Sequence, residues 1–384
     1  MNPFYASMPT TIFEATSGRA RDTGAINLGQ GFPDGRGPAD VLEAASRALL
    51  EESNQYPPMA GLPVLRQAVA DHYRHHQGID LDPMSEVVVT SGATEALAAA
   101  ILGIVSPGDE VLMFQPLYDA YVPLVLQAGG VPRFATLTPP HWRITAEMLD
   151  EAFTERTKVV ILNNPLNPTA TAFTEAELAL LAERVVRNDA ILISDEVWEH
   201  VIFDGRVHQP IMAMPGMRDR TVKIGSGGKI FALTGWKVGW MCAAPPLAGA
   251  VVRAHQFLTF TTPPNLQIAL AYGLGKDDSY FTDMRAELAR SRDRLAAGLD
   301  QAGYHTLPGA GTYFLSVDLP GSGIDLDDVT FCDRLIDEAR VAAIPVSAFF
   351  AENHVRSVVR LCFAKQDATL DEAIDRLAKA RAAF

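Results

Sequence analysis

Two lysines stand close together in a glycine-rich stretch and could do covalent chemistry. Lys229 ends the run Gly225-Ser226-Gly227-Gly228-Lys229, and Lys237 lies in Thr234-Gly235-Trp236-Lys237-Val238-Gly239. Small residues let a flat ligand approach the backbone. One lysine can form an imine, and the other can hold a phosphate as a point charge. The pattern indicates a pyridoxal phosphate (PLP) site, or else a glycine-rich surface turn with two solvated lysines. Ser-x-x-Lys also occurs in β-lactamases.

Two segments place small, polar or aromatic residues directly after a predicted strand. Residues 88–96 read as a strand, a tight turn and a helix start, and Ala93 and Thr94 lie in the turn. Open amides and the helix dipole there favour an anion, although Thr94 could simply cap the helix. Tyr118 follows a second predicted strand. It could stack on a planar ring at that strand end, or pack in the core or an interface.

Asn167 and Asp195 follow two further apolar runs. The run Asn163-Asn164-Pro165-Leu166-Asn167-Pro168-Thr169 is stiffened by two prolines and can aim the amide of Asn167 into a cleft as a donor. The alternative is simple turn chemistry. Asp195 ends an apolar strand, where it needs a cationic partner such as a protonated pyridine nitrogen. Alternatively, Asp195 caps the next helix.

Arg360 stands alone among apolar residues in Val358-Val359-Arg360-Leu361-Cys362-Phe363. A buried arginine is rare unless it is paired. Its planar fork fits a carboxylate in bidentate fashion. The residue therefore indicates a carboxylate site, with an internal salt bridge or an arginine that reaches water as the alternatives.

Short apolar runs alternate with helical patterns over most of the chain. The predicted strands are Val87–Thr90, Glu110–Phe114, Val159–Asn163, Ile191–Ser194, Val222–Gly225 and Val238–Ala243, and predicted helices are Ala93–Ile104, Glu175–Val186 and Leu247–Phe257. This alternation is typical of an α/β fold with a mainly parallel sheet flanked by helices. We expect a large domain at residues 47–277.

The pattern changes from about Asp278 onward. A long charged helix is predicted at Asp283–Ala302, strands at Thr312–Asp318, Val341–Pro345 and Val358–Ala364, and helices at Asp327–Arg340 and Leu370–Ala383. These elements predict a smaller α+β domain of residues 278–384, completed by residues 1–46.

Composition excludes several classes of function. The chain has 384 residues, 48% of them hydrophobic, a net charge of −14 and a pI of about 5.1. Such a chain should repel nucleic acid and anionic membrane. The N-terminus shows no secretory signal, and no apolar run is long enough to span a bilayer. Cys242, Cys332 and Cys362 are too few and too scattered for a disulfide framework or a zinc site. We expect a cytoplasmic protein with no bound metal.

Together these segments resemble the PLP-dependent aminotransferases of fold type I, class I/II. The kynurenine, glutamine and methionine aminotransferase-like group is the branch that they resemble. The resemblance runs nearly end to end. The matching segments, in the family's order, are residues 26–34, Asn54-Gln55-Tyr56 with Gly61, 92–94, 163–168, 194–197, 226–229, 234–240, 311–314 and 360–363.

The resemblance implies that PLP is the cofactor and assigns roles around it. Lys229 would hold PLP as a Schiff base, and Asp195 would pair with its pyridine nitrogen. Asn167 would hydrogen-bond the ring's 3′ oxygen, and Tyr118 would stack on the ring. The groups implied for the phosphate are Ala93, Thr94, Ser226 and Lys237.

The resemblance also implies a substrate site and a partner. Arg360, with Asn167 and the backbone of Gly31, would hold the α-carboxylate of the substrate. Tyr56 would reach the phosphate of the neighbouring subunit, which implies a homodimer with shared active sites.

Two positions depart from the family's usual pattern. Trp198 stands where the family usually has a tyrosine bonded to the 3′ oxygen. An indole N–H can donate one hydrogen bond but cannot accept or ionise. Lys237 stands at a phosphate-binding position where many relatives carry arginine. The lysine keeps the positive charge but lacks the paired N–H donors of a guanidinium.

The expected activity is transfer of an amino group from an amino acid to a 2-oxo acid. Aromatic side chains such as Phe32, Phe257 and Phe260 favour aromatic, methionine-like or glutamine-like donors. One alternative is a PLP-dependent cysteine-conjugate β-lyase, which shares fold and motifs. A second is a non-catalytic PLP-binding regulator, which the lack of a basic patch argues against.

Overall fold

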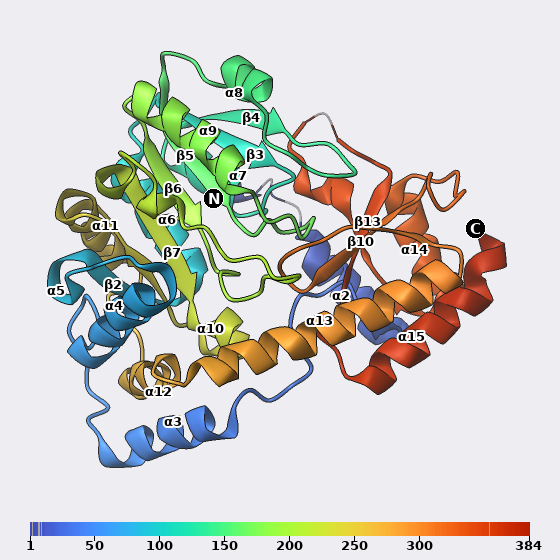
Figure 1. The fold of residues 1–384 in the computed structure, drawn as a ribbon, viewed down its shortest axis with the longest axis horizontal. Coiled ribbons are helices and arrows are strands. Elements are labelled where there is room, and N and C mark those ends of the chain that lie inside the picture. Colours follow the sequence, from blue (N-terminus) through green and yellow to red (C-terminus); the bar gives the residue numbers. More distant parts are fainter. Residues whose placement is uncertain (2, 7, 9, 353) are drawn as a thin grey trace.

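A seven-stranded sheet forms the centre of the molecule (Figure 1). The computed structural model describes the chain except for residues 2, 7, 9 and 353, so these positions of the expected small domain lie outside the described residues. In spatial order the strands are β2 (Val87–Thr90), β8 (Gly239–Cys242), β7 (Thr221–Ser226), β6 (Ile191–Asp195), β5 (Thr157–Asn163), β3 (Glu110–Gln115) and β4 (Val131–Thr136). Strand β8 runs antiparallel to its neighbours, and the other pairs are parallel. The predicted α/β fold with a mainly parallel sheet is confirmed.

Helices cover both faces of this sheet because side chains alternate along each strand. In β3, Val111 and Met113 face one cluster of buried residues, whereas Leu112 and Phe114 face another. The first face carries α6 (Gly92–Ile104), α7 (Tyr121–Gln127) and α11 (Pro245–Leu258), and the second carries α8 (Ala146–Ala152) and α9 (Glu175–Arg187). The sheet is therefore buried on both sides, and its strand ends are left as the place for a site.

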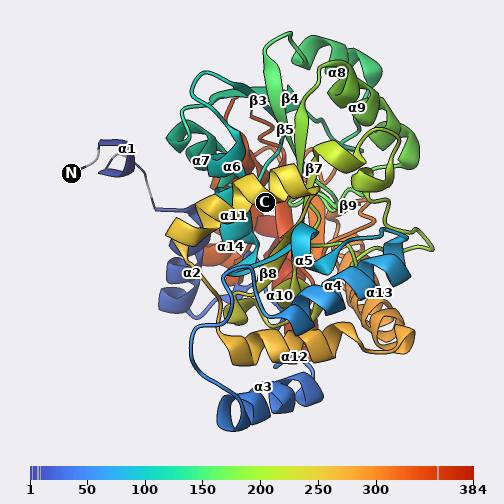
Figure 2. The same ribbon diagram turned by 90° about the vertical axis from the view of Figure 1, so that its left-hand side faces the viewer.

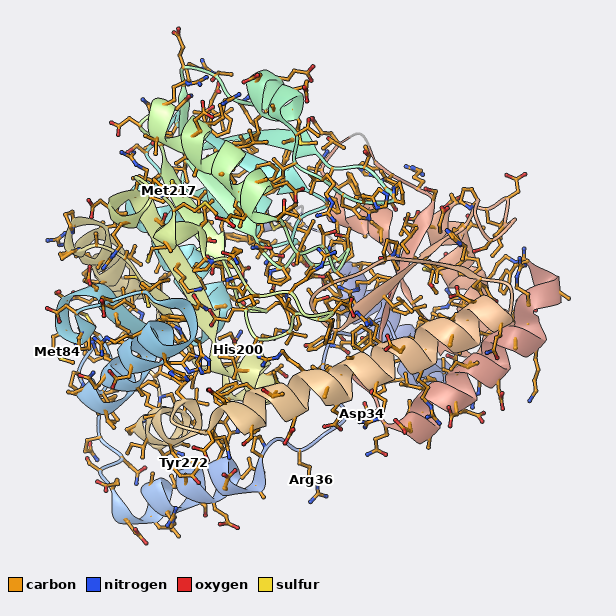
Figure 3. All side chains as sticks on the ribbon, in the orientation of Figure 1. Asp34, Arg36, Met84, His200, Met217 and Tyr272 are labelled. Atoms are coloured by element: carbon orange, nitrogen blue, oxygen red, sulfur yellow. The ribbon has the colours of Figure 1, made fainter. Side chains whose placement is uncertain are left out.

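A third cluster of helices packs beside the β2 edge of the sheet. Its members are α3 (Ala39–Glu51), α4 (Pro63–Gln77), α5 (Pro83–Glu86), α10 (Gly227–Ile230) and α12 (Pro264–Leu274). Helix α3 lies along α12 at the margin of the molecule (Figure 2). Tyr272 of α12 lies in this margin, where its hydroxyl donates to Asp40 of α3 at 3.1 Å (Figure 3). Helix α3 buries Val41 on one face and leaves Leu50 exposed.

The C-terminal third forms a second region around a four-stranded antiparallel sheet. Its strands, in order, are β12 (Ile344–Pro345), β13 (Val358–Cys362), β10 (Phe314–Asp318) and β9 (His305–Leu307). The helices are α13 (Asp278–Gln301), α14 (Asp328–Ala339) and α15 (Asp367–Ala380). Helix α13 runs from beside α12 across to this region, with α15 alongside its far half (Figure 1).

The N-terminal segment joins this second region. Helix α1 (Pro3–Ala6) projects from the body in Figure 2, and α2 (Ile12–Thr23) leads into β1 (Ile26–Asn27). Strand β1 pairs in parallel with β11 (Val341–Ala342). Short 3-10 turns complete the elements at Ile211–Ala213, Arg218–Arg220, Thr234–Trp236, Val346–Phe349 and Arg381–Ala383.

Several elements differ from the sequence-based expectation, and two of these differences have a clear physical reason. The stretch Val341–Pro345, expected as one strand, is split into β11 and β12, which belong to different sheets. Strand β4 was not expected at all, because it contains Pro132 and Arg133 and alternates poorly. It is an edge strand, where a proline is tolerated because half of the backbone groups need no partner.

Candidate functional site

A cavity of about 430 Å³ lies where the central strands end. Strands β5, β6 and β7 end at Asn163, Asp195 and Ser226, and all three residues line it. The cavity also contains most of the residues singled out from the sequence: Ala93, Thr94, Tyr118, Asn167, Asp195, Trp198, Ser226, Lys229 and Lys237. Ligands of open α/β sheets collect at such strand ends.

Lys229 projects from α10, the single turn that follows β7. Its Nζ donates to the hydroxyl of Tyr313 at 3.1 Å and lies 4.5 Å from the centre of the Trp198 ring. Burial lowers the pKa of the Lys229 amine to about 8, and the charges of Arg360 and Lys237 also lower it, whereas Asp195 raises it. A lysine with such a pKa is neutral in part near physiological pH, so it can act as a nucleophile or a base.

Asp195 presents a buried carboxylate at the end of β6. The Tyr121 hydroxyl donates to Oδ2 at 2.6 Å, and the Val197 amide donates to Oδ1 at 3.4 Å. Burial raises the pKa of Asp195, and these hydrogen bonds partly offset that rise. Among the described residues, no lysine, arginine or histidine forms an ion pair with this carboxylate within 4 Å. A buried carboxylate with only neutral donors can stabilise a cation brought in by a ligand.

The other end of the cavity is suited to an anion. It contains the start of α6, where Ser91 makes no side-chain cap, together with Ser226 and Lys237. Gly92 has φ +79°, and a Cβ there would lie 3.5 Å from Nζ of Lys237. Lys237 itself has φ +53°, a left-handed conformation that is uncommon for a side chain of this kind. Uncapped amides, a hydroxyl and an ammonium group converge here as in phosphate sites.

Arg360 and Asn167 form one unit at the side of the cavity. Arg360 is 1% exposed in β13, and its guanidinium donates to Oδ1 of Asn167 at 2.8 Å and to the carbonyl of Gly29 at 2.6 Å. Nε of Arg360 has no partner among the described residues. Because the Oδ1 of Asn167 accepts from Arg360, the Nδ2 group of the same amide is left as a donor. Burial lowers the pKa of Arg360 to about 10, and it stays a cation at neutral pH.

Aromatic side chains close the cavity. Tyr118 is partly buried, and its ring packs edge-on against Tyr121 with centroids 5.7 Å apart. Trp198 is 3% exposed and packs edge-on against Tyr313 at 4.3 Å. Trp198 therefore has two sets of neighbours, the cavity on one side and the Tyr313 ring on the other.

Gly31 and Tyr56 lie differently from the other predicted residues. The carbonyl of Gly31 accepts from the Tyr313 hydroxyl at 2.6 Å, so Gly31 reaches Lys229 through one tyrosine. A Cβ at Gly31 would lie 2.6 Å from the Phe314 ring, so this backbone packs too closely for a side chain. Tyr56 is 84% exposed, contacts Phe260 and does not line the cavity of its own chain.

Three further residues belong to the site, and the sequence analysis gave none of them a role. Tyr121 follows Tyr118 by three residues, a spacing that brings side chains to one side of a helical turn. Asn163 accepts from the amide of Asn167 at 2.8 Å and donates to the carbonyl of Asp195 at 2.9 Å. Tyr313 reaches Lys229 from 84 residues away. Only the helical spacing of Tyr121 was a signal visible in the sequence.

A buried network of charges lies behind Asp195. Lys223 of β7 is 0% exposed and forms ion pairs with Glu196 and with Glu199, the latter at 2.8 Å. His208 contacts the same carboxylate of Glu196 at 2.5 Å. Lys223 and His208 lower the pKa of Glu196 to about 2, although burial opposes them, and the two glutamates raise the pKa of Lys223. The network fixes the backbone that carries Asp195.

The comparisons with known proteins agree with this geometry. Residues 23–377 match the family "Aminotransferase class I and II". The solved structure of N-succinyldiaminopimelate aminotransferase from Mycobacterium tuberculosis superimposes with a TM-score of 0.96 at 43% identity, covering 99% of this chain and 100% of that one. The methionine aminotransferase of Escherichia coli is 41% identical over 368 residues, covering 96% of this chain and 95% of the relative. The kynurenine–oxoglutarate transaminase of Dictyostelium discoideum is 37% identical over 393 residues, covering 92% and 90%.

Each of these relatives is named as an aminotransferase or a transaminase, so the predicted family, activity and cofactor are confirmed. Across the described part of the chain, no helix is both long and apolar enough to cross a bilayer. The chain belongs to the class I and II aminotransferases, PLP-dependent enzymes that move an amino group from an amino acid to a 2-oxo acid.

Proposed function

We propose that this enzyme transfers the amino group of an aromatic or methionine-like amino acid to a 2-oxo acid, with PLP held by Lys229. The observation that supports this proposal most directly is the presence of Lys229 and Asp195 in one cavity of about 430 Å³. Lys229 is an amine whose pKa is about 8, and Asp195 is a buried carboxylate whose hydrogen-bond donors are all neutral. These two groups suit the aldehyde and the ring nitrogen at opposite sides of PLP.

The chemistry of the donor set fits the remaining parts of the cofactor. Ser226, Lys237 and the first amides of α6, at Ala93 and Thr94, would bind the phosphate. Gly92 lies beside Lys237 with φ +79°, a left-handed conformation in which a side chain would be strained, so a glycine is suited to this turn. Tyr118 would stack on the ring.

The 3′ oxygen of the ring would be held by the free Nδ2 of Asn167. This donor is available because Arg360 occupies the other end of the amide. Trp198 lines the same part of the cavity and would offer its indole N–H. Both groups are donors only, so they would favour the deprotonated oxygen.

Arg360 would bind the α-carboxylate of the substrate. Its Nε is without a partner, and its guanidinium lies 3.9 Å from the centre of the Phe314 ring and 5.1 Å from that of Phe349. A carboxylate that reaches this buried cation would be bound strongly and in one orientation. The apolar rings around it support an aromatic or methionine-like donor over an acidic one.

PLP, when bound, supplies an electron sink for the carbanion that forms at the substrate Cα. Once the substrate's amino group has displaced its Nζ from the cofactor, Lys229 would take the α-proton as a neutral amine and later return a proton, and its lowered pKa suits both transfers at neutral pH. Asp195 would keep the ring nitrogen protonated. Arg360 would orient the carboxylate so that the Cα–H bond is the bond that breaks. The amino group would stay with the cofactor when the first 2-oxo acid leaves, and the same steps in reverse would pass it to a second 2-oxo acid.

The relatives suggest a second donor. The 43% identical structure from M. tuberculosis is named for N-succinyldiaminopimelate, which is bulkier and more acidic than methionine. A donor panel should therefore include N-succinyldiaminopimelate beside methionine, kynurenine, glutamine and aspartate, with several 2-oxo acids as acceptors. Turnover restricted to aspartate would contradict the proposed donor class.

We further propose that the enzyme is a cytoplasmic homodimer. Tyr56 is 84% exposed and lies outside the cavity of its own chain, as expected if it reaches the phosphate of a neighbouring subunit. Leu50 and Phe257, 81% and 84% exposed, add apolar surface of the kind that a second copy would cover. Residues 47–277 would form the cofactor domain, and residues 1–46 with 278–384 the smaller one. Light scattering of the wild type and of Tyr56→Phe, with PLP retention measured in both, tests the dimer and the shared site.

Borohydride reduction followed by peptide mapping tests the cofactor site. The pyridoxyl group should be found on Lys229. A label on Lys237 or any other lysine would overturn the assignment, while leaving the family membership intact.

A further inference from the structure

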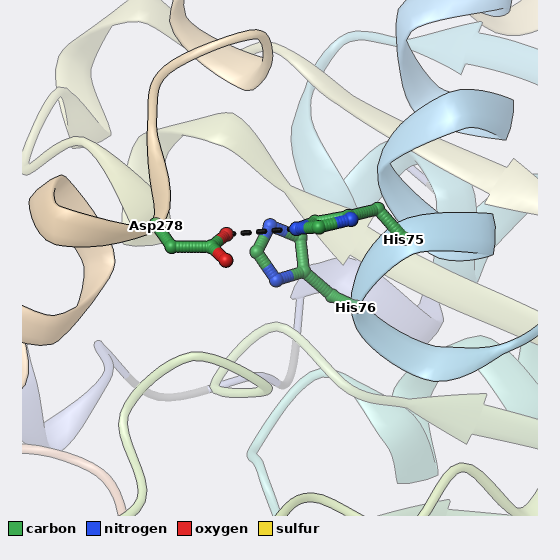
Figure 4. A group of neighbouring side chains, drawn as sticks. All are labelled: His75, His76 and Asp278. Atoms are coloured by element: carbon green, nitrogen blue, oxygen red, sulfur yellow. Dashed lines mark hydrogen bonds and ion pairs between the residues drawn. The ribbon is translucent and has the colours of Figure 1, made fainter.

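A cluster of histidines lies away from the cofactor cavity, where α4 meets α13. His75 and His76 lie in the last turn of α4, and Asp278 begins α13. Figure 4 shows the two imidazoles and the carboxylate facing one another across the gap between the helices. Nε2 of His75 lies 2.8 Å from Oδ1 of Asp278, and one ligand atom of each residue lies within 4.8 Å of the others.

These separations are close to those of a metal site. Zinc binds imidazole nitrogen and carboxylate oxygen at about 2.0–2.2 Å, so ligand atoms around a tetrahedral ion lie about 3.4 Å apart. The observed contact of 2.8 Å and the upper limit of 4.8 Å bracket this spacing. The side chains of His75 and Asp278 are 62% and 70% exposed, so they can adjust by small rotations. Two imidazoles and one carboxylate form a ligand set that suits divalent transition ions.

The surroundings leave room for an ion and its waters. A hollow of about 500 Å³ lies over the cluster and is lined by His72, His75, His76 and Asp278, among others. The nearby ammonium of Lys276 is paired with Asp40, so it does not fill the position between the three ligands.

A second group of possible metal ligands differs from this cluster because it already holds a cation. Glu196, Glu199 and His208 also bring their ligand atoms within 4.8 Å of one another. The ammonium of Lys223 already lies between the two glutamates and forms ion pairs with both. That buried group is complete without a metal. At the His75 cluster, no lysine or arginine of the described residues forms an ion pair with Asp278, and Arg285 acts on it only through its charge at longer range.

We propose that His75, His76 and Asp278 bind one divalent transition metal ion, with Zn²⁺ or Ni²⁺ as the suited ions and water completing the coordination. The proposal departs from the expectation, based on the cysteines, that the chain binds no metal. It is independent of the donor specificity proposed above. The ion would link the end of α4 to the start of α13, so binding should stabilise the folded protein.

Calorimetric titration of the tag-free holoenzyme with Zn²⁺ tests this site. We expect one ion per chain, and at least about tenfold weaker binding in His75→Ala, His76→Ala and Asp278→Asn, since even an indirect change near a metal costs about 10- to 100-fold. His141→Ala removes an exposed histidine outside the cluster and should bind zinc like the wild type. The thermal midpoint should rise with zinc in the wild type and in the control only.

Spectroscopy of the wild type gives a second, independent result. X-ray absorption at the zinc edge should show two imidazole nitrogens among the ligands. Absence of saturable zinc binding in the wild type, equal affinity in all four variants, or a zinc spectrum without imidazole would each overturn the proposal.

Discussion

The hydroxyl of Tyr313 lies between Lys229 and Gly31, accepting from the lysine Nζ at 3.1 Å and donating to the glycine carbonyl at 2.6 Å. An ammonium group makes a stronger hydrogen bond than a neutral amine does. Tyr313 therefore favours the protonated form of Lys229, while burial favours the neutral form and brings the pKa to about 8. The hydroxyl of Tyr313 thus links the reactive amine of Lys229 to the backbone carbonyl of Gly31.

Tyr313→Phe should shift the pH dependence of cofactor attachment. In the wild-type apoenzyme the rate of covalent reaction with PLP should rise as pH passes through about 8, because only the neutral amine is a nucleophile. Loss of the Tyr313 hydroxyl should move this rise to lower pH. It should also destabilise the fold by about 1–3 kcal/mol, since the Gly31 carbonyl loses its donor. Stopped-flow absorbance over a pH series measures the rate, with Tyr118→Phe as the matched control. Equal midpoints in all three proteins would show that Tyr313 does not set the pKa.

Arg360→Ala should raise KM for both the amino donor and the 2-oxo acid while PLP stays bound. The loss of a bidentate, buried charged contact costs about 2–5 kcal/mol, or ~30-fold or more in KM. Arg360→Lys keeps a charge and loses the fork, so its effect should lie between wild type and alanine. Steady-state kinetics with cofactor absorbance as the loading control measures both. Unchanged KM values for donor and acceptor would make Arg360 a structural residue.

Trp198→Tyr should leave the fold intact and change how the bound cofactor titrates. The indole is 3% exposed and lines the cavity, so replacement by tyrosine enlarges the pocket and puts a hydroxyl, which can also accept, near the 3′ oxygen. Absorbance titration of the holoenzyme, together with the donor panel, detects both effects. Trp142→Tyr changes another buried tryptophan outside the cavity and is the control. Superimposable titrations with the same donor preference would mean that Trp198 serves only to pack against Tyr313.

Lys223→Met should destabilise the protein by about 3–5 kcal/mol, because Glu196 and Glu199 would be left buried without their cation. The pKa of Glu196 is lowered to about 2, so its contribution to stability is present above its unfolded pKa of about 4.5 and is lost as pH falls toward 2. Urea unfolding at several pH values measures this. The variant Lys223→Met/Glu196→Gln/Glu199→Gln should recover much of the loss. A stability of Lys223→Met equal to wild type at neutral pH would contradict the network.

The reactive residues of the site could be predicted from the sequence more easily than the buried residues that hold them in place. Lys229, Asp195 and Arg360 attract attention because charged residues are rare in glycine-rich turns and apolar strands. The place of Lys229 and Asp195 in one cavity follows from parallel strands ending at one edge. Arg360 lies in β13 of the second sheet and reaches the cavity through its hydrogen bond to Asn167. Lys223 also stands between apolar residues of a predicted strand, but its partners, Glu196 and Glu199, belong to the loop after β6 and could not be identified from that local pattern.

Contacts between residues that are far apart in the sequence could not be predicted from it. Tyr313 and Gly31 are 282 residues apart, and His75 and Asp278 are 203 apart. Their proximity depends on how the C-terminal region packs on the rest, which no local pattern encodes. Strand β4 was missed for a different reason, since an edge strand has little need for an apolar alternation.

The length of helix α13 would magnify a small tilt at one of its ends. Its 24 residues span about 36 Å, so a tilt of about 5° at Asp278 moves Gln301 by about 3 Å. Helix α15 packs along α13, and Arg294 of α13 forms an ion pair with Asp371 of α15 at 2.6 Å, so a displacement of α13 would be passed to α15 through these contacts. A small rearrangement where α4 holds the near end is therefore magnified at the far end, so a distance probe placed near Gln301 would report a tilt too slight to detect at Asp278 itself.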